Sequence, residues 1–370
     1  MTLVPSKGTG ATKPSERKIR VLVVDDSALA RKLITAALEE ADDIEVAGCA
    51  VDGYSAGVQV AALRPDVLTL DIGMPGMDGI TFLKQSKGRH WAPAVVISAL
   101  TGAGCQTAVA AMRAGAVEVI GKPVDKSGYL DFKALLPVKV RAAFACHRSA
   151  AQSVLLPGHA PPHPIAGSLK LRTPAFIAMG SSTGGTEAVE TILRQMSKDC
   201  PGIVIAQHIP AKFSLMFAER LSQVCPIRVK EAETGDRIRP GVALIAPGDQ
   251  HMEVQHRANG LEVKLNQGPR VGFQRPSIDM LFRSAAIAVS DPAMGVILTG
   301  MGNDGAAGLL AMKAAGAITI AQDEATCAVF GMPREAIRLG AVDHVLPLQV
   351  IASTLSRLHA RGIPAQEAGD

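Results

Sequence analysis

Short apolar runs alternate with longer segments of helical periodicity through the first part of the chain. The runs lie at 19–24, 44–49, 67–70, 94–98 and 117–120, and helical stretches such as 28–40 and 103–114 lie between them. Unbroken apolar strands that alternate with helices are typical of a parallel sheet covered on both faces. The pattern therefore predicts a five-stranded, doubly wound (βα)5 α/β domain over residues 19–147.

A second alternation of the same kind occupies residues 174–360. We expect strands at 175–179, 203–206, 242–246, 294–299 and 317–320. Two further runs alternate between apolar and polar residues and flank Asn259-Gly260, which is a strong hairpin signal. The second domain is therefore predicted to be a mostly parallel α/β sheet with an antiparallel hairpin.

Three segments lack periodicity. Residues 1–18 are polar and rich in Gly, Ser, Thr and Lys, which predicts a disordered tail. Residues 148–173 are rich in Pro and Gly, which indicates a semi-stiff linker. Residues 361–370 are expected to form a loose C-terminal tail. The length of 370 residues suggests two or three domains.

Composition argues against several classes of protein. The net charge is +4 and 19% of residues are charged, which is too weak and scattered for nucleic-acid binding; 3% aromatic residues also argue against base stacking. No apolar stretch approaches the roughly 20 residues that span a bilayer, and the N-terminus lacks a secretory apolar region. The six dispersed cysteines form no C-x-x-C motif, so we expect reduced thiols in a cytoplasmic protein.

Charged residues follow several predicted strands of the first domain. Asp25 and Asp26 follow the first strand, Asp71 the third and Lys122 the fifth, while Ser98 ends the fourth. Ligands of an open parallel sheet bind at these strand ends, and carboxylate oxygens suit Mg²⁺. Beside a bound metal, a carboxylate can attack a phosphoryl group while a lysine neutralises the incoming oxygens. The arrangement predicts a phosphorylation switch.

A serine lies in a glycine-rich turn after the first strand of the second domain. The segment Gly180–Gly185 contains a G-x-S-x-G string centred on Ser182. A serine at a sharp strand-to-helix turn projects its hydroxyl from the sheet, and the following helix offers unpaired N–H groups to an oxyanion. On this segment alone, a serine helix cap and a phosphate-cradling loop are alternatives.

A nucleophilic serine needs a base and a group that orients the base. His208 follows the second strand of this domain, and Asp304 follows the strand at 294–299. Serine, histidine and aspartate at the carboxyl ends of predicted parallel strands indicate a catalytic triad. Their order along the chain differs from the Ser, Asp, His order of the α/β-hydrolases.

Two other classes remain open from these residues. One is a binding protein that holds a nucleotide or a phosphate at the glycine-rich turn, regulated by the first domain. The other is a pseudoenzyme that acts as a scaffold. Turnover of a methyl ester by the second domain separates both from an esterase.

Residues 19–147 resemble the response-regulator receiver domain. The resemblance implies that Asp71 is the phospho-acceptor and that Asp26 ligates Mg²⁺ directly, with Asp25 assisting mainly through water. Gly73 stands where relatives usually have Glu, and its backbone carbonyl would still ligate the metal. The phosphoryl group would be sensed by Ser98 and Lys122.

Over residues 19–358 the chain resembles the CheB family of chemotaxis protein-glutamate methylesterases. The resemblance implies a triad of Ser182, His208 and Asp304, with the backbone amides of Met301 and Thr183 as candidates for the oxyanion hole. The motifs that carry it, besides the receiver, are Gly180-Ser181-Ser182-Thr183-Gly184-Gly185, Gln207-His208-Ile209-Pro210, Arg275-Pro276-Ser277-Ile278-Asp279, Thr299-Gly300-Met301-Gly302-Asn303-Asp304-Gly305 and Gly331-Met332-Pro333-Arg334-Glu335-Ala336.

The family resemblance implies a phosphorylation-activated serine esterase. Its substrates would be γ-methyl glutamyl esters on the cytoplasmic helices of chemoreceptors, with deamidation of receptor glutamines as a second reaction. A chemotaxis histidine kinase would be the phosphodonor, and the unphosphorylated receiver would cover the active site. We expect Mg²⁺ in the receiver, no cofactor in the esterase domain, a monomer, no nucleic-acid partner and no membrane insertion.

Overall fold

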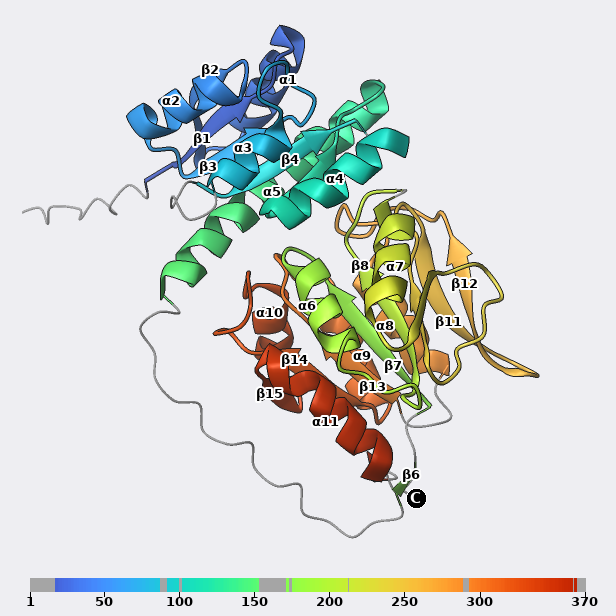
Figure 1. Ribbon diagram of the computed structural model, residues 1–370. Coiled ribbons are helices and arrows are strands. Elements are labelled where there is room, and N and C mark those ends of the chain that lie inside the picture. Colours follow the sequence, from blue (N-terminus) through green and yellow to red (C-terminus); the bar gives the residue numbers. More distant parts are fainter. Residues whose placement is uncertain are drawn as a thin grey trace, which may run out of the picture.

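The computed structural model describes residues 17–86, 92–99, 102–152, 171–172, 175–211, 213–288, 293–361 and 363–364. Most of the predicted tails at 1–18 and 361–370, and most of the predicted linker at 148–173, lie outside the described residues. The described chain forms two α/β domains, with the first seated on one end of the second (Figure 1). Among the described residues, no helix is long and apolar enough to cross a membrane.

The first domain is a five-stranded sheet in the order β2-β1-β3-β4-β5, and every neighbouring pair is parallel. Its strands are β1 (Ile19–Val24), β2 (Ile44–Ala50), β3 (Val67–Leu70), β4 (Ala94–Ser98) and β5 (Glu118–Gly121). Its helices are α1 (Ala28–Glu39), α2 (Gly53–Leu63), α3 (Gly79–Ser86), α4 (Gly102–Ala114) and α5 (Lys126–Gln152). The predicted (βα)5 domain is confirmed, and α5 continues five residues past the predicted domain end at 147.

Both faces of this sheet are buried, which explains why its strands are apolar without interruption. Val21 and Val23 belong to a cluster with Leu136 of α5, whereas Leu22 belongs to a second cluster with Phe82 of α3. Successive side chains of a strand point to opposite faces. Helices α1 and α5 therefore cover one face, and α2, α3 and α4 cover the other.

The second domain has a seven-stranded sheet in the order β15-β14-β13-β7-β8-β10-β9, and every neighbouring pair is parallel. Its strands are β7 (Phe176–Ser181), β8 (Gly202–Gln207), β9 (Arg228–Glu231), β10 (Val242–Ile245), β13 (Ala293–Ile297), β14 (Ile318–Gln322) and β15 (His344–Leu346). Its helices are α6 (Gly185–Leu193), α7 (Phe213–Val224), α8 (Ile278–Ala288), α9 (Ala306–Ala314), α10 (Met332–Arg338) and α11 (Leu348–Arg361). Helices α6, α7 and α11 cover one face, and α8, α9 and α10 cover the other.

The predicted hairpin is confirmed as β11 (His251–Arg257) and β12 (Gly260–Asn266). It forms its own two-stranded sheet and packs on α8, where the Val254 amide donates to the Ser284 hydroxyl at 2.9 Å. Gly260 has φ +108°, a conformation that glycine adopts readily at a tight turn. A second short pair joins β6 (Leu171–Arg172) to β16 (Ile363–Pro364), so the linker's end meets the C-terminal segment.

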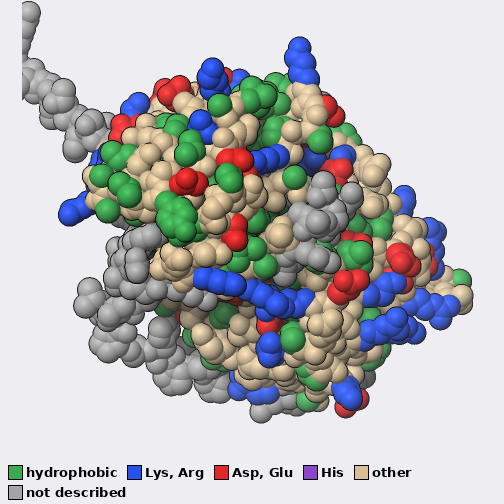
Figure 2. Space-filling view, turned by 45° about the horizontal axis from the view of Figure 1, so that its top comes forward, with side chains coloured by type: hydrophobic (Ala, Val, Ile, Leu, Met, Phe, Trp, Pro, Cys, Tyr) green, Lys and Arg blue, Asp and Glu red, His purple; other side chains and the backbone are tan. Residues whose placement is uncertain are grey.

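Contacts between the two domains hold the first domain over one end of the second (Figure 1). Asp131 of α5 pairs with Arg270 at 3.4 Å, and the Thr183 hydroxyl donates to Glu118 of β5. One cluster of buried apolar side chains contains residues of both domains. On the face in Figure 2, basic and acidic side chains are interspersed.

Candidate active site

The order of strands in the second domain reverses beside β7. The chain passes from β7 to β8 on one side and later returns to β13 on the other. Ligand sites of open α/β sheets lie at such a switch point, beyond the carboxyl ends of the strands. Ser182 follows β7, His208 follows β8 and Asp304 follows β13, so the topology brings all three to one crevice.

Ser182 lies at a sharp turn fixed by its own backbone. Its N–H donates to the Thr299 carbonyl at 3.0 Å, and its carbonyl accepts from the Gly185 amide at 2.7 Å. Gly184 has φ +75°, a backbone conformation that residues with a side chain rarely adopt. A β-carbon on Gly300 would lie 2.7 Å from that of Ser182, so glycine is needed for this close approach.

The three side chains form a continuous hydrogen-bonded chain. Ser182 Oγ lies 3.1 Å from His208 Nδ1, and His208 Nε2 lies 2.8 Å from Asp304 Oδ2. An ionised carboxylate only accepts hydrogen bonds, so Nε2 carries the proton and Nδ1 is left to accept from the serine. Ser182 is 6% exposed and His208 is 7% exposed, which keeps this chain away from bulk water.

Asp304 is an acceptor at the start of α8 rather than the cap of its own helix. Its carboxylate accepts from the Ser277 hydroxyl and from the amides of Ile278 and Asp279, while Gly305 is the cap residue of α9. Burial raises the pKa of Asp304, but hydrogen bonds and the charge of His208, with the backbone N–H groups, outweigh it and lower the pKa overall. The carboxylate therefore stays ionised.

The neighbouring serine faces away from this chain. The Ser181 hydroxyl donates to the Gln207 side chain, and the Gln207 amide donates to the Ser182 carbonyl at 2.9 Å. Of the two adjacent serine hydroxyls, that of Ser182 bonds the His208 ring, whereas Ser181 meets His208 through its carbonyl, which accepts from the His208 backbone N–H at 3.1 Å. Sequence analysis did not identify Gln207, although it precedes His208 in the same motif.

Two backbone amides are available beside Ser182. The backbone N–H groups of Thr183 and Met301, which directly follow Ser182 and Gly300, have no acceptor within the described part of the chain. An oxyanion hole requires such unpaired donors close to the nucleophile. The Thr183 side chain is committed elsewhere, since its hydroxyl donates to Glu118 of the first domain.

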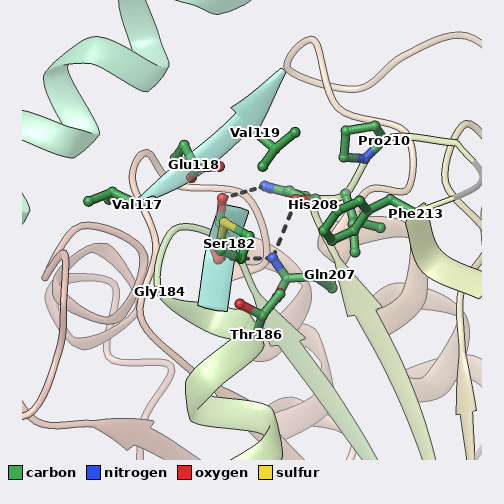
Figure 3. Close-up of a pocket in the computed structure, with 12 residues that line it drawn as sticks. Val117, Glu118, Val119, Ser182, Gly184, Thr186, Gln207, His208, Pro210 and Phe213 are labelled. Atoms are coloured by element: carbon green, nitrogen blue, oxygen red, sulfur yellow. Dashed lines mark hydrogen bonds between the residues drawn. The ribbon is translucent and has the colours of Figure 1, made fainter. Parts of the chain in front are cut away.

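The first domain closes the pocket over Ser182 (Figure 3). The pocket has about 20 Å³, which is room for about one water molecule. The first domain contributes Met112, Val117, Glu118 and Val119 to its lining. Glu118 is buried together with Lys139, and their charged atoms lie 2.9 Å apart. No sequence pattern marks Glu118 as a site residue, because its contact with Thr183 depends on how the two domains meet.

The second candidate site lies at the strand ends of the first domain. Oxygens of Asp25, Asp26 and Asp71 lie within 4.8 Å of one another. Lys122 Nζ lies 2.8 Å from Asp25 and 3.0 Å from Asp71. Three clustered carboxylates without thiol or imidazole ligands fit a hard divalent cation such as Mg²⁺. Ser98 is buried at the end of β4, next to this cluster in the strand order.

The negative charge of these carboxylates is only partly neutralised by Lys122. Burial raises the pKa of Asp25 and outweighs its bonds to Lys122 and Ser27, and the charge of Asp71 adds to the rise. Burial lowers the pKa of Lys122, but its two carboxylate partners raise it overall. Asp26 and Gly73 are exposed at the mouth of the cluster, where a ligand can reach them.

These two sites on these two folds define a class: a response regulator whose second domain has the side-chain arrangement of a serine hydrolase. The family within this class is identified by comparison with known proteins. The model of the CheB methylesterase family matches residues 177–355, and that of the response regulator receiver domain matches residues 21–131.

Two curated relatives match nearly the whole chain. Protein-glutamate methylesterase/protein-glutamine glutaminase 2 of Syntrophus aciditrophicus is 47% identical over 92% of this chain and 99% of its own length. The protein-glutamate methylesterase/protein-glutamine glutaminase of Salmonella typhimurium is 45% identical over 93% of this chain and 98% of its own length. The Thermotoga maritima CheB methylesterase catalytic domain is 38% identical, with a TM-score of 0.49, over 50% of this chain and 99% of that chain.

The chain belongs to the CheB family of receiver-regulated protein-glutamate methylesterases. Membership does not favour the alternative of a protein that binds a nucleotide or phosphate at the glycine-rich turn. The hydrogen-bonded serine, histidine and aspartate also argue against a pseudoenzyme.

Proposed function

We propose that this protein hydrolyses methyl esters of glutamate side chains on chemoreceptors when its receiver domain is phosphorylated. The single observation that supports this most strongly is the hydrogen-bonded chain from Ser182 through His208 to Asp304, lying beneath β5 of the receiver. Ser182 supplies the nucleophile and His208 the base, and the receiver domain regulates access to them.

In the acylation step, His208 Nδ1 accepts the proton of Ser182 as Oγ attacks the ester carbonyl. The imidazolium that forms is stabilised by Asp304, which accepts from Nε2. The negative charge on the carbonyl oxygen is met by the amides of Thr183 and Met301. The carbon–oxygen bond then breaks, His208 returns the proton to the leaving oxygen, and methanol departs.

In the second step, water attacks the glutamyl-serine ester. His208 takes a proton from the water, and Ser182 leaves with that proton, so that glutamate and the free enzyme result. A primary amide can follow the same route with ammonia as the leaving group. We therefore include deamidation of receptor glutamines as a second reaction, in keeping with the names of the relatives.

The receiver site supports phosphoryl transfer to Asp71 from the phosphohistidine of a chemotaxis histidine kinase. Asp26 and Asp71, with the carbonyl of Gly73 and with Asp25 assisting, would hold Mg²⁺. Bound Mg²⁺ supplies positive charge that offsets the charge of the phosphoryl oxygens. We infer that Lys122 and Ser98 sense those oxygens, and the contact between Lys122 and Asp71 supports this for the lysine.

Regulation follows from the closed pocket. Receiver side chains such as Glu118 and Val119 line the pocket over Ser182 and leave room for about one water, so we infer that the receiver withdraws before a protein side chain with its ester reaches the serine. Glu118 has a glutamate side chain, like the product of the reaction. Its carboxylate accepts a hydrogen bond from the hydroxyl of Thr183, which is next to Ser182. Glu118 also pairs with Lys139 of the receiver at 2.9 Å, and we infer that phosphorylation of Asp71 favours a receiver conformation in which these contacts at the pocket are released.

The test is methanol release from methylated chemoreceptor by the full-length protein. We expect turnover that rises with a small phosphodonor and disappears in Ser182→Ala. No release from the phosphorylated wild-type protein would contradict the proposal. The cytoplasmic location and the monomeric state stay predictions, which fractionation and light scattering can test.

A further inference from the structure

One recognised motif of the sequence has no part in the reaction described above. It is Arg275-Pro276-Ser277-Ile278-Asp279, which precedes and begins α8. Ser277 at its centre is 0% exposed, and its hydroxyl donates to Asp304 Oδ1 at 2.9 Å. A buried hydroxyl that donates to the acid of the triad can affect the reaction without touching the substrate.

The Ser277 hydroxyl completes the hydrogen bonding of Asp304. Oδ2 accepts from His208 Nε2 at 2.8 Å and from the Ile278 amide at 2.8 Å. Oδ1 accepts from the Ser277 hydroxyl at 2.9 Å and from the Asp279 amide at 2.9 Å. A carboxylate has about four acceptor positions, so all of them are occupied and the carboxylate cannot rotate without losing bonds.

Ser277 is itself held from the opposite side by a histidine of the hairpin. Its backbone N–H donates to His251 Nδ1 at 3.1 Å, and His251 Nε2 lies 3.0 Å from the Pro269 carbonyl. The carbonyl can only accept, so Nε2 carries the proton and Nδ1 is free to accept from Ser277. His251 is 1% exposed, and this tautomer satisfies both of its nitrogens.

We propose that Ser277 is a positioning residue for the esterase reaction, and that His251 fixes Ser277 in place. Ser277 acts through Asp304: it fixes the rotation of the carboxylate and shares its negative charge. Both effects determine how His208 is oriented and how strongly its protonated form is stabilised. The proposal rests on the proposed function for the reaction itself.

A structural role for Ser277 as the cap of α8 gives a different expectation. Its hydroxyl also lies 3.4 Å from the Met280 amide, at the long end of hydrogen-bond distances. Loss of a cap destabilises a helix, but it leaves the pH dependence of catalysis unchanged. The pH profile therefore separates positioning from capping.

The sign of the expected shift follows from the charges around Asp304. Removing one donor leaves more negative charge facing His208, which favours its protonated form. The other ionisable groups that face this region are Asp279 of α8, which is near Arg283, His251 of β11, and Glu118 of the receiver across the pocket. All of them are retained when only the Ser277 hydroxyl is removed.

The experiment compares Ser277→Ala with Ser277→Thr in the phosphorylated full-length protein. For the alanine variant we expect kcat to fall about tenfold with KM unchanged, as for loss of a hydrogen bond to a charged group. The acid limb of its pH–rate profile should move to higher pH by up to about one unit. Threonine retains the hydroxyl, so it should restore the position of the acid limb.

Ser284→Ala is the matched control, because Ser284 is on the same helix and bonds Val254 and Leu281 instead of Asp304. It should leave the acid limb where it is. An unchanged acid limb in Ser277→Ala, or an equal shift in Ser284→Ala, would overturn the proposal. His251→Gln should give a smaller shift in the same direction as Ser277→Ala.

A second readout needs no substrate. The imidazole N–H proton that His208 shares with Asp304 gives a downfield NMR resonance in proteins with such pairs, and its shift reports the strength of the bond. It should move in Ser277→Ala and not in Ser284→Ala. If the wild-type protein hydrolyses no ester but this resonance moves, the proposed function fails while the positioning contact stands. If the resonance does not move, the positioning proposal fails.

Discussion

Asp25 in the receiver and Asp304 in the esterase domain occupy equivalent places and behave in opposite ways. Each lies at the carboxyl end of a parallel strand and each is largely buried. The pKa of Asp25 is raised, because burial outweighs its bonds to Lys122 and Ser27. The pKa of Asp304 is lowered, because His208 and the backbone donors outweigh its burial.

The difference shows what each site is built to do. Asp25 has other carboxylates beside it and an exposed mouth through Asp26, so its charge is incompletely balanced and a cation can complete it. Asp304 accepts hydrogen bonds on both oxygens, so its carboxylate is fixed in one orientation. The receiver site around Asp25 can change its charge when it binds a cation. The carboxylate of Asp304 keeps the same charge and orientation.

The largest expected effect is a loss of esterase activity, and it tests whether the site that contains Ser182 and Asp304 is catalytic. Ser182→Ala should lower the rate of methanol release about 10⁴-fold or more, because members of a triad act as a unit. Ser181→Ala is the matched control and should retain activity within about tenfold, since its hydroxyl faces Gln207. Strong activity in Ser182→Ala would contradict the assignment.

A second test addresses the site that changes its charge. Asp71→Asn should abolish incorporation of phosphate from a small phosphodonor, because an amide oxygen is a far weaker nucleophile than a carboxylate. EDTA should do the same in the wild-type protein, and Mg²⁺ should restore it, since the clustered carboxylates suit a hard cation. Phosphorylation that persists in EDTA would count against the metal site.

A smaller effect is expected where the two sites are connected. Glu118→Ala removes the hydrogen bond to Thr183 and leaves Lys139 unpaired in the interface. Both changes weaken docking of the receiver, so the unphosphorylated esterase activity should rise about three- to tenfold. Glu40→Ala is the control, because it breaks an exposed receiver pair with Lys133. An unchanged basal rate in Glu118→Ala would argue against this contact as the closure.

The smallest effect concerns stability, measured by calorimetry on metal-free protein. Asp304→Asn leaves donors without a charged acceptor and should lower the free energy of unfolding by about 1–3 kcal/mol. Asp25→Asn relieves a disfavoured buried charge and should be neutral or stabilising. A stability loss in Asp25→Asn equal to that in Asp304→Asn would remove the contrast between the sites.

The same contrast predicts opposite pH dependences. Because the folded pKa of Asp304 is depressed, its contribution to stability is present above the ordinary value near 3.8 and is lost as the pH falls through the folded pKa. The folded pKa of Asp25 is raised, so its ionisation opposes folding at neutral pH, and this opposition fades as the pH falls. Comparing acid unfolding of Asp304→Asn and Asp25→Asn with wild type measures both signs.

All five strands of the first sheet and the central strands of the second could be predicted from the sequence, and the two edge strands of the second sheet could not. A central strand is buried on both faces and reads as an apolar run, as Val67–Leu70 does. At the edges of the second sheet, three of the four residues of Arg228–Glu231 are charged and His344–Leu346 has three residues, so neither gives such a run. Helix α5 passes the predicted boundary because no strong breaker follows residue 147 until Pro157.

The candidate site residues could be named from the sequence because each follows a strand or a recognised turn. Topology then determines that the ends of β7, β8 and β13 meet. The supporting residues have no such signal: Ser277 reaches Asp304 through the start of a helix, and Glu118 reaches Thr183 across a domain boundary. These contacts depend on side-chain packing and on domain docking, which local patterns do not encode.

The central claim is that phosphorylation of one site opens the other. The most direct measurement is the initial rate of methanol release from methylated receptor by the full-length protein, with and without a small phosphodonor and Mg²⁺. The account predicts a clear rise on phosphorylation, no rise in Asp71→Asn, and no release in Ser182→Ala under either condition. An equal rate with and without phosphorylation, at full phosphate incorporation on Asp71, would contradict it.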